Sequence, residues 1–97
     1  ISMVIRMMVL VVVVLLAGCS GAPVQEMSDA RQAIKAAVSV GAQTKSPGSF
    51  SKAQKHLLSA KAALEQGHFS RARSSAIRAK RHAIKARQIS INYPVNY

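Results

Sequence analysis

The 97-residue sequence is poor in the residue types that catalytic and disulfide-stabilised proteins use most. It contains one cysteine, so no internal disulfide bond can form, and three carboxylates, so we expect no paired acid–base site. It has no tryptophan and only four other aromatic residues, which leaves little surface for stacking on bases. These absences predict a small protein that is not an enzyme and needs no cofactor.

Apolar residues and positive charge, which the sequence does have, are concentrated in different parts of it. Sixteen of the first 19 residues are apolar, against 32 of the remaining 78. Lysine and arginine number 14 in total and give a formal net charge of +11. The sequence therefore divides into an apolar leader and a basic, alanine-rich domain, and its length allows one domain at most.

The leader, residues 1–18, has the layout of a signal peptide, with Arg6 followed by an unbroken apolar run over residues 7–17. At 1.5 Å per residue this run covers about half of a ~30 Å hydrocarbon core, so we do not expect it to span a membrane. The last residues resemble the lipobox of bacterial lipoproteins: Leu16, Ala17, Gly18 and Cys19. The resemblance implies cleavage before Cys19 and attachment of diacylglycerol to its sulfur.

Acyl chains on Cys19 would hold the mature protein at a membrane. Ser20 resembles the residue found after the cysteine in lipoproteins sorted to the outer membrane of enteric bacteria. We therefore expect a lipid-anchored protein of the outer membrane that faces the periplasm. The alternative is that Cys19 is an ordinary apolar cysteine at the end of a buried or spanning helix.

The remaining residues predict an all-α fold, a short three-helix domain that follows the signal peptide. Residues 19–27 contain glycine and proline and are expected to form a tether, with Ser28 as the N-cap of the first helix. Apolar residues at helical spacing then predict a domain over 28–91, with a loop at 41–49 and a C-terminal tail at 92–97. The expected helices cover about 29–41, 50–66 and 70–91.

The third predicted helix contains an approximate seven-residue repeat, which places small residues along one line of the helix. Such a seam lets two helices approach closely, and the larger Phe50, Leu57 and Leu64 of the second helix are expected to face it. The seam consists of Ala72, Ala76, Ala79, Ala83, Ala86 and Ser90.

The turn between the second and third helices, residues 64–72, is similar to the turn of a tetratricopeptide repeat (TPR). In this TPR-like antiparallel hairpin, Gly67 is expected to end one helix, Phe69 to fill the bottom of the hairpin, and Ala72 to allow close crossing. More broadly, residues 28–88 resemble a family of small bacterial lipoproteins that carry a helical domain of unknown function. That resemblance implies a helical fold and says almost nothing about activity.

Seven basic residues within 17 positions of the third helix are the strongest functional feature of the domain. They form either a solvated helix face or a surface for an anionic partner, such as lipid headgroups, peptidoglycan carboxylates or an acidic protein. We do not expect a nucleic-acid partner in the periplasm. Nucleic-acid binding would be possible only if residues 1–18 are not a signal peptide. The seven are Arg71, Arg73, Arg78, Lys80, Arg81, Lys85 and Arg87.

Two smaller features remain open at the sequence level. Ile77, Ile84 and Ile91 form a second apolar line, which either packs against the first helix or is left for a partner. His56 and His82, like His68, are expected to be separate surface residues without a metal. The favoured function is thus a lipid-anchored structural or interaction protein, followed by an accessory subunit of a larger envelope complex and by nucleic-acid binding.

Overall fold

The computed structural model describes residues 1–18 and 21–93, and it describes no side chains at positions 12–18. The described residues form five helices and no strand: α1 (Ser2–Gly18), α2 (Val24–Ser39), α3 (Ala42–Lys45), α4 (Pro47–Glu65) and α5 (Phe69–Ile91). The predicted all-α fold is therefore confirmed. Among these helices, none combines the length and the apolar character needed to cross a membrane.

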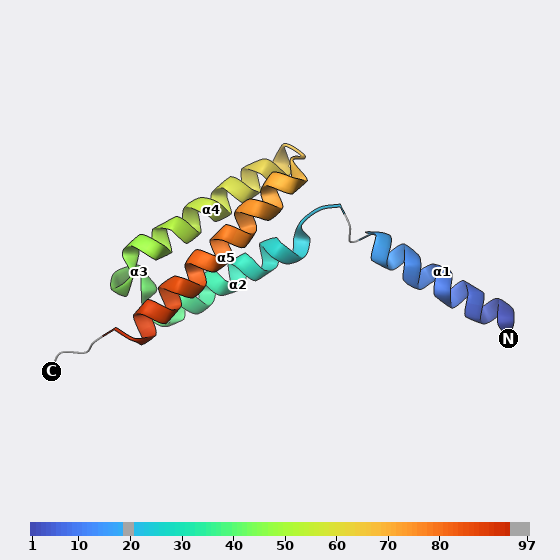
Figure 1. Ribbon diagram of the computed structural model, residues 1–97, viewed down its shortest axis with the longest axis horizontal. Helices are drawn as coiled ribbons and strands as arrows, with labels where there is room; N and C mark the ends of the chain where they lie inside the picture. The colour runs from blue at the N-terminus through green and yellow to red at the C-terminus, as the bar shows by residue number, and fades with distance from the viewer. Residues whose placement is uncertain (19–20, 94–97) are drawn as a thin grey trace.

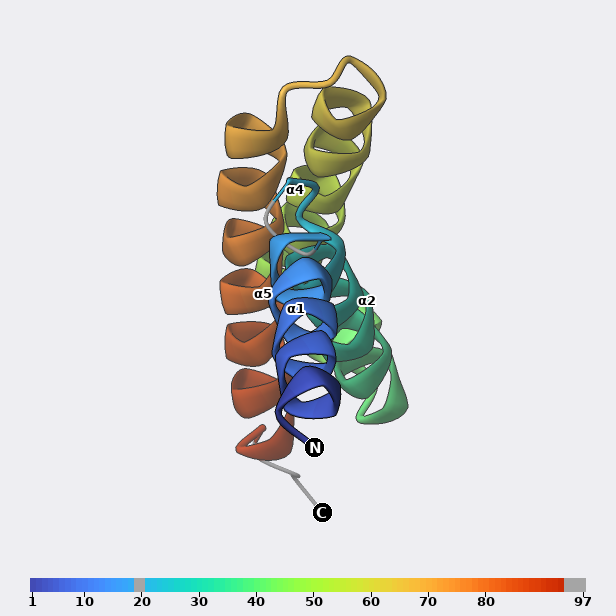
Figure 2. The ribbon, with the colours of Figure 1, turned by 90° about the vertical axis from the view of Figure 1, so that its right-hand side faces the viewer.

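Helices α2, α4 and α5 make up the body of the domain. In Figures 1 and 2, α4 and α5 form an antiparallel hairpin, and α2 runs alongside α5 in the same direction. The closest packing is between α4 and α5, followed by that between α2 and α5. Within the described residues all contacts between helices are made among α2–α5, so the helix contacts that stabilise this fold lie within residues 24–91.

The core of the domain is built mainly of alanine. All six residues of the predicted α5 seam are buried, and Ala53, Ala60 and Ala63 are the buried alanines of α4. Alanine side chains let helix backbones approach closely, and Phe50 adds the one large buried ring beside Ala86. The close contact of α4 with α5 thus follows from the alanine repeat.

Helix α2 begins at Val24, so the predicted start at residue 29 and the predicted tether up to residue 27 are both wrong. Met27 is only 2% exposed and packs with Ala30, Ala60, Ala76 and Ala79. Burying this side chain stabilises an additional turn at the start of α2. Ser28 consequently lies inside α2 and is not its N-cap.

The predicted loop at 41–49 is also largely helical. Gly41, with φ +77°, ends α2, and the short α3 follows directly. Helix α4 begins at Pro47, because proline has the backbone angle of a first helical residue and lacks the N–H that would remain unpaired there. The hydroxyl of the buried Ser46 donates to the Ala86 carbonyl over 2.9 Å and fastens this junction to α5.

The α4–α5 turn is a glycine-terminated helix end, as expected for Gly67. Gly67 has φ +77°, and the His68 N–H donates to the Ala63 carbonyl over 2.8 Å. Helix α5 then starts at Phe69, one residue before the predicted start. The Phe69 ring is 41% exposed, so the expectation that it fills the bottom of the hairpin is wrong.

Candidate anion-binding surface

Six of the seven basic residues of α5 fall on two flanks of the helix, one on each side of the buried alanine seam, and Arg81 lies opposite the seam. One flank faces α2, where Arg73 Nε lies 3.3 Å from Glu26 Oε1 and Lys80 Nζ lies 3.9 Å from Asp29 Oδ2. Glu26 belongs to the part of α2 that lies before the predicted start at residue 29. Two of the seven charges are thus matched by the carboxylates of α2.

The other flank carries Arg71, Arg78 and Lys85, which we call the basic face. They follow one another at seven-residue spacing, so at 1.5 Å per residue their Cα atoms are about 10 Å apart along one line. All three are exposed, and among the described residues none of them has a carboxylate within ion-pair distance. Arg81 and Arg87 are likewise exposed and without such a carboxylate there.

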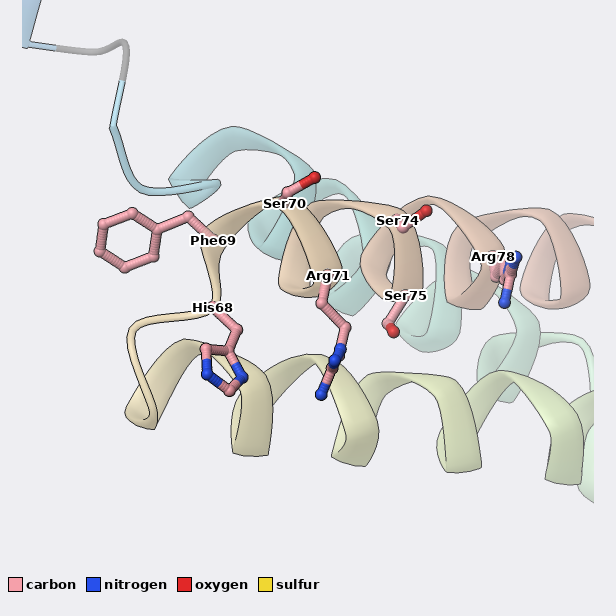
Figure 3. Close-up of a pocket in the computed structure, with 7 residues that line it drawn as sticks. All are labelled: His68, Phe69, Ser70, Arg71, Ser74, Ser75 and Arg78. Atoms are coloured by element: carbon pink, nitrogen blue, oxygen red, sulfur yellow. The ribbon is translucent and has the colours of Figure 1, made fainter.

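An open groove of about 570 Å³ lies at the N-terminal end of the basic face. Figure 3 shows Arg71 and Ser75 projecting from α5 toward α4, Arg78 at the far end, and Phe69 turned away from them. Guanidinium groups and hydroxyls together suit an anion with several oxygen acceptors. The groove is lined by His68, Phe69, Ser70, Arg71, Ser74, Ser75 and Arg78.

Two histidines, which the sequence placed apart, meet across the α4–α5 hairpin. The imidazole rings of His56 and His82 are stacked, with centroids 5.2 Å apart and planes 7° from parallel. Partial burial, followed by the neighbouring His56, Lys52 and Lys85, lowers the pKa of His82 below its usual value. Within the described chain, no three His, Cys, Asp or Glu side chains come together as a metal site.

An apolar groove of about 260 Å³ lies on the opposite flank, between α2 and α5. Ile77 and Ile84 line it and remain 37% and 41% exposed, and Ile91 is 53% exposed. The apolar line therefore borders α2 but is not buried by it. Charged side chains surround the two isoleucines of the groove: Glu26, Asp29, Lys80 and Arg81.

The other sequence-predicted site residues are distributed as follows. Gly67 lies at the α4–α5 turn, and Ala72 lies in the buried seam of α5. Leu16, Ala17 and Gly18 form the end of α1, whereas Cys19 lies outside the described residues. The three carboxylates do not gather, since Glu65 ends α4 while Glu26 and Asp29 lie on α2.

Comparison with known families identifies the helical part of the chain. A family model described as a domain of unknown function, DUF4398, matches residues 25–90, which are about two thirds of the sequence. The chain belongs to this family. The DUF4398 match covers nearly all of α2–α5 and excludes α1 and the lipobox.

No curated protein and no solved structure matches the chain significantly. The DUF4398 match confirms, at the level of the family, the resemblance to a helical domain of unknown function. A proposal for the function therefore has to rest on the arrangement of the charged side chains.

Proposed function

We propose that this protein is a lipid-anchored, non-enzymatic interaction protein of the cell envelope, whose DUF4398 domain binds an anionic partner through the basic face of α5. The observation that carries the proposal is the unequal distribution of carboxylates around α5. Glu26 and Asp29 pair with Arg73 and Lys80 on one flank. Arg71, Arg78 and Lys85 are exposed and, among the described residues, have no carboxylate within ion-pair distance. An anionic surface would supply the missing counter-charge.

The lipobox sequence supports an anchor at Cys19, in the outer membrane and facing the periplasm. Residues 1–18 would be removed as the signal peptide, and residues 19–23 would link the acyl chains to α2. This short link keeps the domain close to the membrane. Each basic residue near an anionic membrane contributes about 1 kcal/mol of attraction, so the anchor and the basic face would act together.

The anchor is tested by metabolic labelling with a fatty acid in a bacterial host. We expect the wild type to be labelled and membrane-bound, and Cys19→Ala to lose both the label and the membrane association. Ser28→Ala, a change of similar size outside the lipobox, should retain both. An unlabelled, cytosolic wild type would contradict the anchor and favour the nucleic-acid alternative.

The basic face is tested with residues 21–97 and vesicles that contain phosphatidylglycerol. Replacing Arg71, Arg78 and Lys85 by Gln should weaken vesicle binding by up to about 100-fold, since three contributions of about 1 kcal/mol are lost. The control replaces Arg31, Lys35 and Lys61, exposed cations of α2 and α4, by Gln. It changes the net charge equally, so an equal loss would mean that only total charge matters.

A second candidate function, a subunit of a larger envelope complex, is favoured by the exposed isoleucines beside α2. In-cell photocrosslinking from position 84 should then give reproducible protein adducts, whereas exposed Leu58 of α4 serves as a control position. We also propose that the α4–α5 hairpin is TPR-like, a type of hairpin that would suit a protein partner. The helix-ending Gly67 and the buried Ala72 support it, while the exposed Phe69 departs from the pattern.

A further inference from the structure

The stacked imidazoles lie at the middle of the cationic α4–α5 surface. His82 follows Arg78 by four residues and precedes Lys85 by three, so all three side chains share one side of α5. His56 follows Lys52 by four residues on α4 and contacts His82 through its ring. Two lysines and an arginine therefore surround a pair of groups that can each gain a further positive charge.

Among the residues that the structure describes, no carboxylate compensates the charge of this cluster. Glu26 and Asp29 of α2 face the other flank of α5, and Glu65 lies nine residues beyond His56, about 14 Å along α4. Helix α3 contributes one charged residue, Lys45, whose side chain folds back over Gly41. Protonating both imidazoles in the free protein would thus place two positive charges about 5 Å apart among other cations.

We propose that His56, His82, Lys52 and Lys85 form a proton-linked binding site for a phosphate monoester group, an inference that rests on the proposed anion-binding function. A phosphate offers three acceptor oxygens and a charge of about −1.5 to −2 at neutral pH. Imidazolium and ammonium groups both donate hydrogen bonds to such oxygens, and Lys52 and Lys85 lie near enough to His82 to affect its charge. A carboxylate, with two oxygens and one charge, would leave donors of the cluster unmatched.

The proton linkage follows from the sign of the charges. In the free protein, partial burial and the surrounding cations lower the pKa of His82. A bound phosphate dianion is an opposite charge and raises the pKa of His82. Binding therefore takes up protons, and affinity rises as the pH falls, by at most about tenfold per pH unit for each proton taken up. Below about pH 6 the phosphate itself becomes protonated, so the rise levels off there.

The first measurement is an NMR titration of the three histidines of residues 21–97 between pH 5 and pH 8, the range in which imidazoles titrate. It compares inorganic phosphate with sodium chloride at equal ionic strength. We expect phosphate to raise the pKa of His82 and to shift the ring resonances of His56 with it. His68 lines the groove at the end of the basic face, so a response of His68 alone would place the phosphate in that groove and would overturn the site, as would no response at all.

The second measurement distinguishes a lipid headgroup from a soluble phosphate group. Phosphatidic acid has a monoester headgroup and phosphatidylglycerol a diester, so vesicles of the two lipids are compared at pH 8 and pH 6. If binding tightens at pH 6 on phosphatidic acid more than on phosphatidylglycerol, the ligand is a lipid headgroup. A histidine shift in inorganic phosphate without such tightening supports a soluble phosphate group as the ligand.

Variants separate this site from the basic face. His56→Gln/His82→Gln should lose the tightening between pH 8 and pH 6, and the single variant His56→Gln provides the test if the double variant loses its helical circular dichroism. Lys61→Gln, which changes an exposed cation of α4 outside the cluster, is the control and should retain it. If the wild type binds vesicles without any pH dependence and inorganic phosphate leaves the pKa of His82 unchanged, binding through the basic face remains supported and the proton-linked site is wrong. If no vesicle is bound at any pH, the proposed membrane partner is wrong, and the NMR titration still decides this site.

Discussion

At the scale of single residues, Gly67 and Gly41 have the most specific backbone requirement in the described part of the domain, and Gly67 is the easier of the two to test. Its φ of +77° is a conformation that costs other L-residues about 1–2 kcal/mol, and a Cβ placed there would meet no atom within 4 Å. Gly67→Ala should therefore lower the free energy of unfolding by about 1 kcal/mol through backbone strain alone, part of which the stiffer unfolded chain offsets. Urea denaturation followed by circular dichroism measures this change.

Gly48 provides a matched control for that substitution. It lies in the first turn of α4, and a Cβ there also has open space around it. Gly48→Ala should raise the free energy of unfolding by about 0.5 kcal/mol, because alanine loses less entropy than glycine in a helix. Equal effects of the two substitutions would show that the left-handed conformation of Gly67 has no energetic importance.

The histidine pair illustrates which part of the candidate site could be predicted from individual residues. Residue type and spacing predicted that the basic residues of α5 form a candidate binding surface. They did not predict that His56 and His82 are in contact. Both lie thirteen positions from Phe69, one before it and one after it, and an antiparallel hairpin brings such positions together. The pairing became predictable only once the centre of the turn was known, since helical spacing within one element gives no information across two.

At the scale of helices, the alanine seam of α5 follows directly from the seven-residue repeat. Ala79 is fully buried and packs with Met27, Ala30, Ala60 and Ala76, so no space exists for a longer side chain. Ala79→Leu should lower the free energy of unfolding by about 1–3 kcal/mol, because it forces α2, α4 and α5 apart. Chemical denaturation of residues 21–97 measures the loss.

Ala62 of α4 separates this packing effect from helix propensity. Its side chain is exposed, and leucine forms helices nearly as well as alanine. Ala62→Leu should change the free energy of unfolding by no more than about 0.5 kcal/mol. If Ala79→Leu were equally harmless, the helices would have to accommodate the larger side chain by moving, and the seam would not determine their spacing.

The starts of α2 and α4 were harder to predict than the seam, for two physical reasons. The first turn of α2 is stabilised by the burial of Met27 against α4 and α5, which is a contact between distant parts of the sequence. Pro47 and Gly48 predicted a break by composition, although proline is well suited to the first position of a helix. The three long helices were predictable because their apolar spacing persists over many turns.

At the scale of the whole molecule, positive charge exceeds negative charge far more than the ion pairs can balance. Without Arg6 of the leader, 13 lysine and arginine residues remain against three carboxylates. Two of those carboxylates form ion pairs whose side chains are about one third to one half exposed, and such pairs contribute about 0–1 kcal/mol each. The domain therefore folds against a net electrostatic repulsion, which an anionic partner or dissolved salt can reduce.

This repulsion predicts how stability depends on ionic strength. The screening length falls from about 30 Å at 0.01 M to about 3 Å at 1 M salt, so distant like charges lose their interaction before close ion pairs do. The free energy of unfolding of residues 21–97 should thus increase as sodium chloride is added over this range. Replacing Arg71, Arg78 and Lys85 by Gln should raise stability at low salt and flatten the dependence. A decrease in stability with salt would instead mean that the pairs of Glu26 and Asp29 outweigh the repulsion among the cations.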